Sequence, residues 1–246
     1  MEKKLIKRYV ILGILFFLPV IFLIMLYPAQ HNYNPLDVVN EEVLELKNFK
    51  STSDQAVSLS DQAVSLKDHI TVLGFLGSQP LKNSIGASNL KELVYDKFKG
   101  FKKFQVVIVL PMGSENEAEL LKNEIGKYED LRFWHFIFGN ENAIQQFYGS
   151  LKSNGTLDSA LATESVFIID KELHQRGRLD DRTDNELEKD APVYDLVSYN
   201  TIEVAEIKNK MNDDMRILFT EYRQKRKGNF DSTSRRADDL KNDNND

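Results

Sequence analysis

The sequence predicts an α/β fold in which helices flank one central sheet. Four compact apolar runs rich in Val, Ile and Phe have the character of strands that are buried on both faces. They lie at residues 70–76, 104–110, 131–138 and 165–170. Between each two consecutive runs lies a segment with the apolar spacing of a helix. Because strand and helix alternate, we expect a mostly parallel sheet with right-handed crossovers.

Three helices are predicted between these strands. Asn89 with Glu92, and Ser114 with Glu117, have the spacing of a cap and the third helical residue, which satisfies backbone donors at a helix start. A third helix is expected after Asn140. The expected apolar faces are Leu90, Leu93, Val94 and Phe98; Ala118, Leu121, Ile125 and Tyr128; and Ile144, Phe147, Tyr148 and Leu151.

A hairpin and a last helix are predicted after the fourth strand. The segment "KELHQRGRLDD" (171–181) indicates a turn and an outgoing antiparallel strand, followed by an acidic loop to Asp190. The last helix is expected to begin near Asn200 with Glu203 and to pack on the sheet. Its apolar stripe is Val204, Ile207, Met211, Met215, Leu218 and Tyr222.

Composition excludes several classes of function. The chain has 246 residues, 15 Phe and 9 Tyr, which is enough for one sizeable core. It has no cysteine, so disulfides, thiolate nucleophiles and cysteine-ligated metals are excluded. A net charge of -6 gives no basic footprint of the kind that phosphate backbones select. Nucleic acid is therefore not an expected partner.

The amino end predicts a membrane anchor. Residues 9–27 contain no charged side chain and have about the length that crosses a hydrocarbon core of ~30 Å as a helix. Lys3, Lys4, Lys7 and Arg8 precede this run, whereas residues 28–36 contain no Lys or Arg. Residues 1–8 are thus expected to stay cytoplasmic, with the rest of the chain in the periplasm of a bacterial inner membrane. A cleaved signal peptide is the alternative, but its apolar core is usually ~7–15 residues long.

The remaining parts of the chain divide by composition. Residues 28–52 are interpreted as a tether that gains order near the domain, and residues 53–227 as the domain. The heptad "SDQAVSL" occurs twice, at 53–59 and 60–66, and is interpreted as a duplicated edge segment with strand character. Residues 228–246 have almost no apolar content, so this tail is expected to be disordered.

Four segments together resemble the thioredoxin-like superfamily, in particular its Sco/SenC branch of copper chaperones. They are "VSLKDHITVLGFLGS" (64–78), "VVIVLPMGSENEAELLKNEIGKY" (106–128), "LRFWHFIFGNENAIQQFYGSL" (131–151) and "SVFIIDKELHQRGRLDD" (165–181). The resemblance implies a thioredoxin-like central mixed sheet flanked by helices. It also implies an amino-terminal membrane anchor and a role around cytochrome oxidase assembly.

The sequence departs from this family where the chemistry occurs. Active members have a C-x-x-x-C pair at the end of the first core strand, where this chain has Gly77, Ser78, Gln79 and Pro80. They also have a histidine shortly before the hairpin strand, where this chain has the pair at 163–164 (Thr, Glu). Copper binding and thiol exchange are therefore not expected, and we assign no catalytic residue, metal ligand or cofactor.

The loop 77–88 is the one candidate ligand site. It joins a strand end to a helix start, where amide donors and the helix dipole favour small anions. The candidate residues are Gly77, Ser78, Lys82, Ser84 and Asn89. Ordinary connecting loops have the same composition as this one, so a structural connector without a ligand is the favoured interpretation.

Other potential sites have simpler explanations. His31, His69, His135 and His174 are scattered without the spacing of metal ligands. Met211 and Met215 have the spacing of a core stripe. The basic and aromatic segment "DKFKGFKKF" (96–104) fits a helix face and a strand start. Its lysines are expected to form a solvated rim or to contact anionic lipid or an acidic partner.

These observations predict a membrane-anchored thioredoxin-like protein without redox activity that acts as a binding or assembly factor. Its partners would be the lipid bilayer, through residues 9–27, and a protein of the inner membrane or periplasm. Two alternatives stay open. The chain could be a structural accessory subunit of a membrane complex, or a non-redox enzyme that uses the 77–88 loop.

Overall fold

The computed structural model describes residues 9, 12–22, 35–47, 49–51, 64–128 and 130–226. The chain divides into two units, Met1–Asn34 and Pro35–Asp246. Residues 12–22 are helical. Among the described residues no helix combines the length and apolar character that a bilayer crossing requires. The rest of the predicted span, most of the duplicated heptads and the predicted tail lie outside the described residues.

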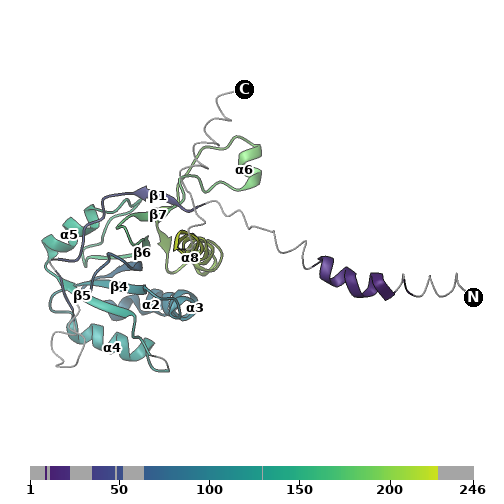
Figure 1. Cartoon of the computed structure of the whole chain (residues 1–246). Helices are drawn as coiled ribbons and strands as arrows, with labels where there is room; N and C mark the ends of the chain where they lie inside the picture. The colour runs from purple at the N-terminus through teal and green to yellow at the C-terminus, as the bar shows by residue number, and fades with distance from the viewer. Residues whose placement is uncertain are drawn as a thin grey trace, which may run out of the picture. The chain divides into compact units, whose positions relative to one another are not determined.

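The second unit is built on one mixed sheet of eight strands (Figure 1). The strand order is β1-β7-β6-β3-β4-β5-β2, and β8 pairs with β6. The strands are β1 Asp37–Asn40, β2 Lys50–Ser51, β3 Ile70–Leu76, β4 Phe104–Pro111, β5 Trp134–Gly139, β6 Ala162–Ile169, β7 Gln175–Gly177 and β8 Tyr199–Asn200.

Strands β3, β4 and β5 are parallel, as predicted, but the fourth predicted strand is not. β6 pairs antiparallel with β3, and Ala162 at its start lies opposite Leu76 at the end of β3. The reason is the connection after α5, because residues 150–161 bring the chain back to the carboxyl end of β3. From there only an antiparallel strand can follow, and β6 continues into β7 as the predicted hairpin.

Helices cover both faces of the sheet, and strand alternation divides the core accordingly. Val72, Val106 and Ile108 belong to one buried cluster, and Leu73 and Val107 to the other. The helical segments are η2 Pro80–Asn83, α2 Ser84–Leu90, η3 Lys91–Tyr95, α3 Asp96–Phe98, α4 Glu115–Ile125, α5 Glu141–Gly149, α6 Asp184–Glu188, α7 Val204–Glu206, η4 Ile207–Met211 and α8 Asn212–Arg226.

The predicted helix starts are confirmed in two cases of three. The Asn140 side chain accepts a hydrogen bond from the Ala143 amide at 2.8 Å, as a cap of α5 should. Helix α4 does follow Ser114, although the Ser114 hydroxyl donates to the Pro111 carbonyl instead of capping. The prediction for Asn89 was wrong, because α2 begins at Ser84. The helical segment already starts with η2, where Pro80 in the first helical turn favours a helix start.

Most of the predicted apolar faces are buried. Ile207, Met211, Met215 and Leu218 are inaccessible to solvent. Tyr128 was expected inside, yet it is 84% exposed because α4 ends at Ile125. Helix α6 lies in the segment that was predicted as an acidic loop.

The domain begins earlier than predicted. Part of the expected tether forms β1, which pairs antiparallel with β7. Val43 and Leu46 are buried in the core. The Glu45 carboxylate accepts hydrogen bonds from the Leu66 amide at 2.8 Å and the Lys67 amide at 3.0 Å. Burial of apolar side chains and these bonds add residues 35–51 to the domain that was predicted to begin at residue 53.

Candidate functional site

The loop after β3 packs closely against the segment before β6. Gly77 has a φ of +70°, and a Cβ there would lie 2.5 Å from the Ala160 carbonyl oxygen. The Ser78 amide donates to the same oxygen at 2.8 Å. Only glycine fits this left-handed position without strain. The position that holds redox chemistry in the resembling family is therefore occupied here by a tight backbone contact.

Polar side chains of the loop support the fold. The Asn83 side chain donates to the Leu76 carbonyl at 2.9 Å, and the Asn89 side chain donates to the Thr201 carbonyl at 2.9 Å. Ser78 and Lys82 are exposed and Ser84 is half-buried. Of the five predicted ligand residues, Gly77 and Ser78 thus contact the Ala160 backbone, and Asn89 bonds to Thr201. Ligand binding by this loop stays a prediction.

Helix α2 and the segment after β8 meet beside this loop. A Cβ on Gly86 would lie 2.5 Å from the Thr201 hydroxyl oxygen and 3.6 Å from Cδ1 of Ile202. Ile85, next to Gly86 in the sequence, is 65% exposed, and Ile202 is 41% exposed. We call these two residues and the exposed Val204 the Ile85 surface.

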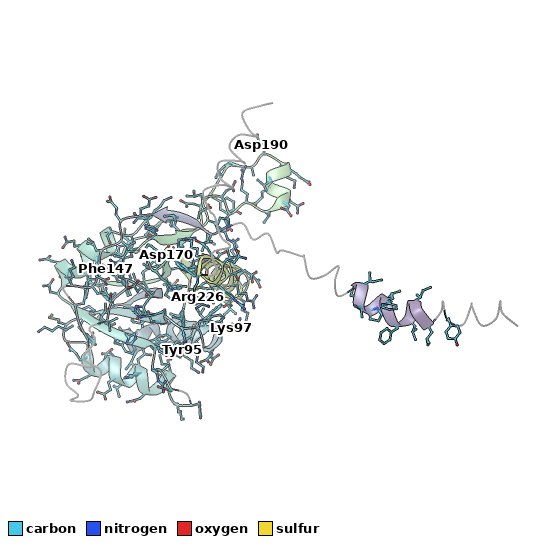
Figure 2. All side chains as sticks on the ribbon, viewed as in Figure 1. Tyr95, Lys97, Phe147, Asp170, Asp190 and Arg226 are labelled. Carbon is cyan, nitrogen blue, oxygen red and sulfur yellow. The ribbon has the colours of Figure 1, made fainter. Side chains whose placement is uncertain are left out.

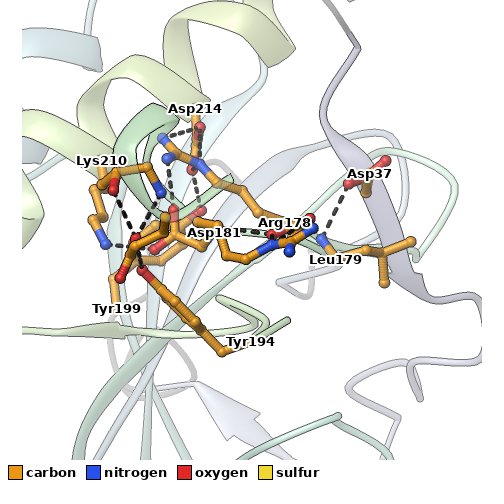
Figure 3. Close-up of polar contacts among 12 residues, drawn as sticks. Asp37, Arg178, Leu179, Asp181, Tyr194, Tyr199, Lys210 and Asp214 are labelled. Carbon is orange, nitrogen blue, oxygen red and sulfur yellow. Dashed lines mark hydrogen bonds and ion pairs between the residues drawn. The ribbon is translucent and has the colours of Figure 1, made fainter. Parts of the chain in front are cut away.

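A buried charge cluster holds the segment that supports the Ile85 surface (Figure 3). The Tyr199 hydroxyl donates to Asp214 Oδ2 at 2.7 Å. Arg178 Nε donates to the same oxygen at 3.0 Å, and Arg178 Nη1 donates to Asp181 Oδ1 at 2.8 Å. Lys210 also pairs with Asp181. The cluster joins the segment after β7 to β8 and α8, and so fixes residues 199–201 against the domain.

Burial governs the electrostatics of this cluster. Desolvation raises the pKa of Asp214, although hydrogen bonds from Arg178 and Tyr199 act in the opposite direction. Desolvation and the Asp214 charge raise the pKa of Tyr199 well above its ordinary value. For Arg178, desolvation is outweighed by the bonds to Asp214 and Asp181, which raise its pKa. Tyr199 is therefore a neutral donor and Arg178 a permanent cation.

A second buried cluster joins the amino-terminal segment to α8. Arg176 Nη1 donates to Asp170 Oδ2 at 2.9 Å, and Arg176 Nη2 donates to Glu221 Oε2 at 2.5 Å. The same Nη2 donates to the Leu36 carbonyl at 2.6 Å. Although burial opposes it, the two carboxylates raise the pKa of Arg176. One guanidinium thus connects the start of the domain to its last helix.

Both clusters were missed by sequence reasoning, although one signal was present. Asp214 lies at the helical spacing of the apolar stripe, three residues after Met211 and four before Leu218. An acidic residue in a buried stripe predicts a basic partner. The partner Arg178 comes from a distant strand, so spacing alone does not identify it.

Metal-ligand chemistry finds no support in the described residues. No three or more His, Cys, Asp or Glu side chains in the described part of the chain could hold a metal ion. His135 is in β5, where burial, with smaller contributions from His69 and Lys122, lowers its pKa to about 4. His135 is therefore neutral at physiological pH.

No protein-family model matches the chain, and no curated protein does. Solved structures do. The soluble domain of Sco1 from Bacillus subtilis has 14% identity, a TM-score of 0.39, and coverage of 74% of this chain and 94% of its own. Copper-bound ScoI from Bradyrhizobium japonicum has 14% identity, a TM-score of 0.33, and coverage of 64% and 92%.

A third similar structure is the thioredoxin domain of a thiol-disulfide oxidoreductase from Bacteroides vulgatus. It has 15% identity and a TM-score of 0.35, and the match covers 63% of this chain and 100% of that domain. The element order of the present structure has the features that the sequence resemblance implies. A helix follows the first core strand, and the β6–β7 hairpin leads into the final helix. The chain has a mixed α/β fold with a central sheet flanked by helices, and it contains no cysteine.

Proposed function

We propose that this chain is a membrane-anchored, periplasm-facing binding or assembly factor that performs no redox chemistry. A protein of the inner membrane or periplasm would dock on the Ile85 surface. The sequence resemblance to the Sco/SenC branch makes cytochrome oxidase biogenesis the process to test first. The non-redox enzyme alternative is not favoured by any contact of the 77–88 loop among the described residues.

The observation that supports docking most directly is the contact of Gly86 with Thr201 and Ile202. It brings α2, which carries the exposed Ile85, against the segment that carries the exposed Ile202. Exposed apolar side chains cost solvation free energy unless a partner covers them. Arg178, Asp214 and Tyr199 hold residues 199–201 in place beside this surface, which should reduce the conformational entropy that binding there would lose.

The anchor is supported by the chemistry of the amino end. The described helical residues 12–22 include exposed large apolar side chains such as Leu15 and Phe16. Four basic residues precede the apolar run at 9–27, and none occurs at 28–36. This asymmetry is typical of a helix whose amino end stays cytoplasmic. Protease treatment of spheroplasts should remove the domain, and its survival there would contradict the orientation.

Co-purification from membranes in mild detergent tests the docking proposal. The variants Ile85→Asp and Ile202→Asp should lose the bound partner while keeping the wild-type unfolding midpoint. Leu120→Asp on α4 is the matched control, because Leu120 is also exposed. Equal partner recovery in all three variants contradicts the proposal.

The nature of the recovered partner separates the remaining alternatives. A partner recovered in substoichiometric amounts together with oxidase assembly intermediates supports an assembly factor. A stoichiometric complex with other membrane subunits identifies an accessory subunit instead. Purified protein should retain no stoichiometric copper, and retention of copper after dialysis would contradict the absence of metal chemistry.

A further inference from the structure

One surface beside the last helix combines an exposed aromatic ring with basic side chains. Phe101 is 48% exposed and stacks on Phe219 of α8, with ring centroids 4.4 Å apart and an interplanar angle of 26°. Phe98 also stacks on Phe219, at 5.4 Å. These stacked rings fix the turn between α3 and β4 against α8.

Five cations belong to this region. Lys97, Lys102 and Lys103 surround Phe101 in the sequence, and all three are exposed. Arg223 and Arg226 follow Phe219 by four and seven residues, so they lie on the same face of α8. We call Phe101 and these five residues the Phe101 surface. Figure 2 shows Lys97 and Arg226 at the edge of the domain where α3 and α8 meet.

The five cations of this surface form no ion pair with any residue that the structure describes. Asp96, which is the nearest acidic residue to Phe101 in the sequence, pairs with Lys91 at 2.9 Å and with Lys99 at 3.3 Å. The chain as a whole has a net charge of -6. A basic face on an acidic protein favours an anionic binding partner.

The Phe101 surface lies at the end of α8 where the domain receives its amino-terminal segment. The Leu36 carbonyl and Glu221 Oε2 both accept hydrogen bonds from Arg176 Nη2, at 2.6 Å and 2.5 Å. Glu221 is two residues before Arg223. Residues 23–34 separate the described helix from Pro35, and a chain of that length spans at most about 45 Å. If the amino-terminal helix anchors the chain, this segment limits how far Pro35 can lie from the bilayer.

We propose that the Phe101 surface binds anionic phospholipid headgroups of the membrane that holds the amino-terminal helix. This inference rests on the anchor in the proposed function. Each Lys or Arg near an anionic membrane contributes ~1 kcal/mol, which salt reduces. An aromatic ring beside such cations suits the membrane interface. Because a tether gives an effective concentration of about 1 mM, weak headgroup contacts suffice to orient the domain.

The absence of cysteine permits a direct test on the full chain in nanodiscs. Gly100→Cys and Gly155→Cys each introduce one thiol at an exposed glycine whose added Cβ would meet open space. Each thiol receives the same fluorophore, and a lipid with a nitroxide headgroup quenches the fluorescence. We expect at least about threefold stronger quenching at residue 100 than at residue 155 in discs with anionic lipid. The difference should vanish in neutral lipid and at high salt.

Paired charge reversals identify the residues responsible. Lys102→Glu with Lys103→Glu should abolish the extra quenching at residue 100. Lys122→Glu with Lys127→Glu makes the same charge change on exposed lysines elsewhere and should preserve it. Phe101→Ser should weaken quenching without removing its dependence on anionic lipid.

The outcomes separate this inference from the proposed function. If alkaline carbonate extracts the chain from membranes, the anchor is wrong and this inference is wrong with it. If the chain stays in the discs but residues 100 and 155 are quenched equally, only the lipid contact is overturned. Crosslinking of residue 100 to an acidic protein in native membranes, with no dependence on lipid charge, also overturns it.

Discussion

Arg178, directly after strand β7, is joined to Asp214 of helix α8 by a forked ion pair. Arg178 Nη2 lies 2.9 Å from Asp214 Oδ1, and Arg178 Nε lies 3.0 Å from Oδ2. The Asp214 side chain is almost fully buried, and the Arg178 side chain is 30% exposed. Because Tyr199 donates to the same carboxylate, the pair also positions the segment that supports the Ile85 surface.

Removing the guanidinium should destabilise the domain. Arg178→Ala leaves the Asp214 carboxylate buried without its cation, which should cost about 2–3 kcal/mol of unfolding free energy, the low end for buried pairs because Arg178 is partly exposed. Urea denaturation measures this loss. Adding Asp214→Asn should recover part of the loss, since the unpaired charge is then gone. Arg216→Ala, at an exposed ion pair with Asp213, is the control and should leave the midpoint nearly unchanged.

Gly77→Ala should destabilise the domain by about 2 kcal/mol. The substitution forces alanine into a left-handed conformation and places its Cβ against the Ala160 carbonyl. Gly155→Ala is the matched control, because a Cβ there meets open space and the φ of Gly155 is not positive. Equal urea midpoints for the two variants would show that the 77–78 turn tolerates a side chain, which contradicts the tight contact described here.

Protonation of His135 should make stability depend on pH. Burial lowers its pKa to about 4 in the folded chain, whereas the unfolded chain binds the proton near pH ~6.5. The unfolding free energy should therefore fall as pH decreases from about 6.5 to about 4, by roughly 3 kcal/mol in total. His135→Gln should remove this part of the slope. A slope that is the same in both proteins would assign the pH dependence to other groups.

Glu45 should hold the chain segment before β3 in place. Its carboxylate accepts bonds from the amides of Leu46, Leu66 and Lys67 and from the Ser65 hydroxyl. Although burial opposes it, these bonds lower the pKa of Glu45. Their contribution is thus present above the unfolded pKa of ~4.3 and is lost as pH falls through the folded pKa.

Hydrogen exchange measures this contribution. In Glu45→Gln the amides of Leu66 and Lys67 should exchange roughly tenfold faster at neutral pH, because a charged acceptor has been replaced by a neutral one. Glu41→Gln, at an exposed position, should leave both rates unchanged. Unchanged exchange in Glu45→Gln would mean that the core contact of Leu66 alone protects these amides.

The sequence identified the main strands because apolar runs within a few residues of one another are enough to predict them. The apolar runs around Val72, Val107 and Phe167 require burial on both faces of a sheet, and each forms a strand. One local signal was not recognised in the sequence. Thr183 and Glu186 form a capping box at the start of α6, with the same spacing as Asn89 with Glu92 and Ser114 with Glu117, but they lie in a segment that was predicted as an acidic loop.

Long-range pairing explains the elements that the sequence did not reveal. The direction of β6 follows from where residues 150–161 return the chain, and Gly86 of α2 packs against Thr201. Both contacts join residues that are far apart in the sequence. Propensity and periodicity describe neighbours within a few positions, so neither could specify them.

By itself the sequence determined that this protein has no thiol chemistry, because cysteine is absent at every position. It also determined where the core strands lie along the chain and most of the buried helix faces, since apolar spacing depends only on residues close in the sequence. Only the tertiary structure decided which charges are buried together and which apolar side chains remain exposed. Those properties depend on distant segments such as Arg178 with Asp214, or Gly86 with Ile202, and contact between such segments arises only when the chain is folded.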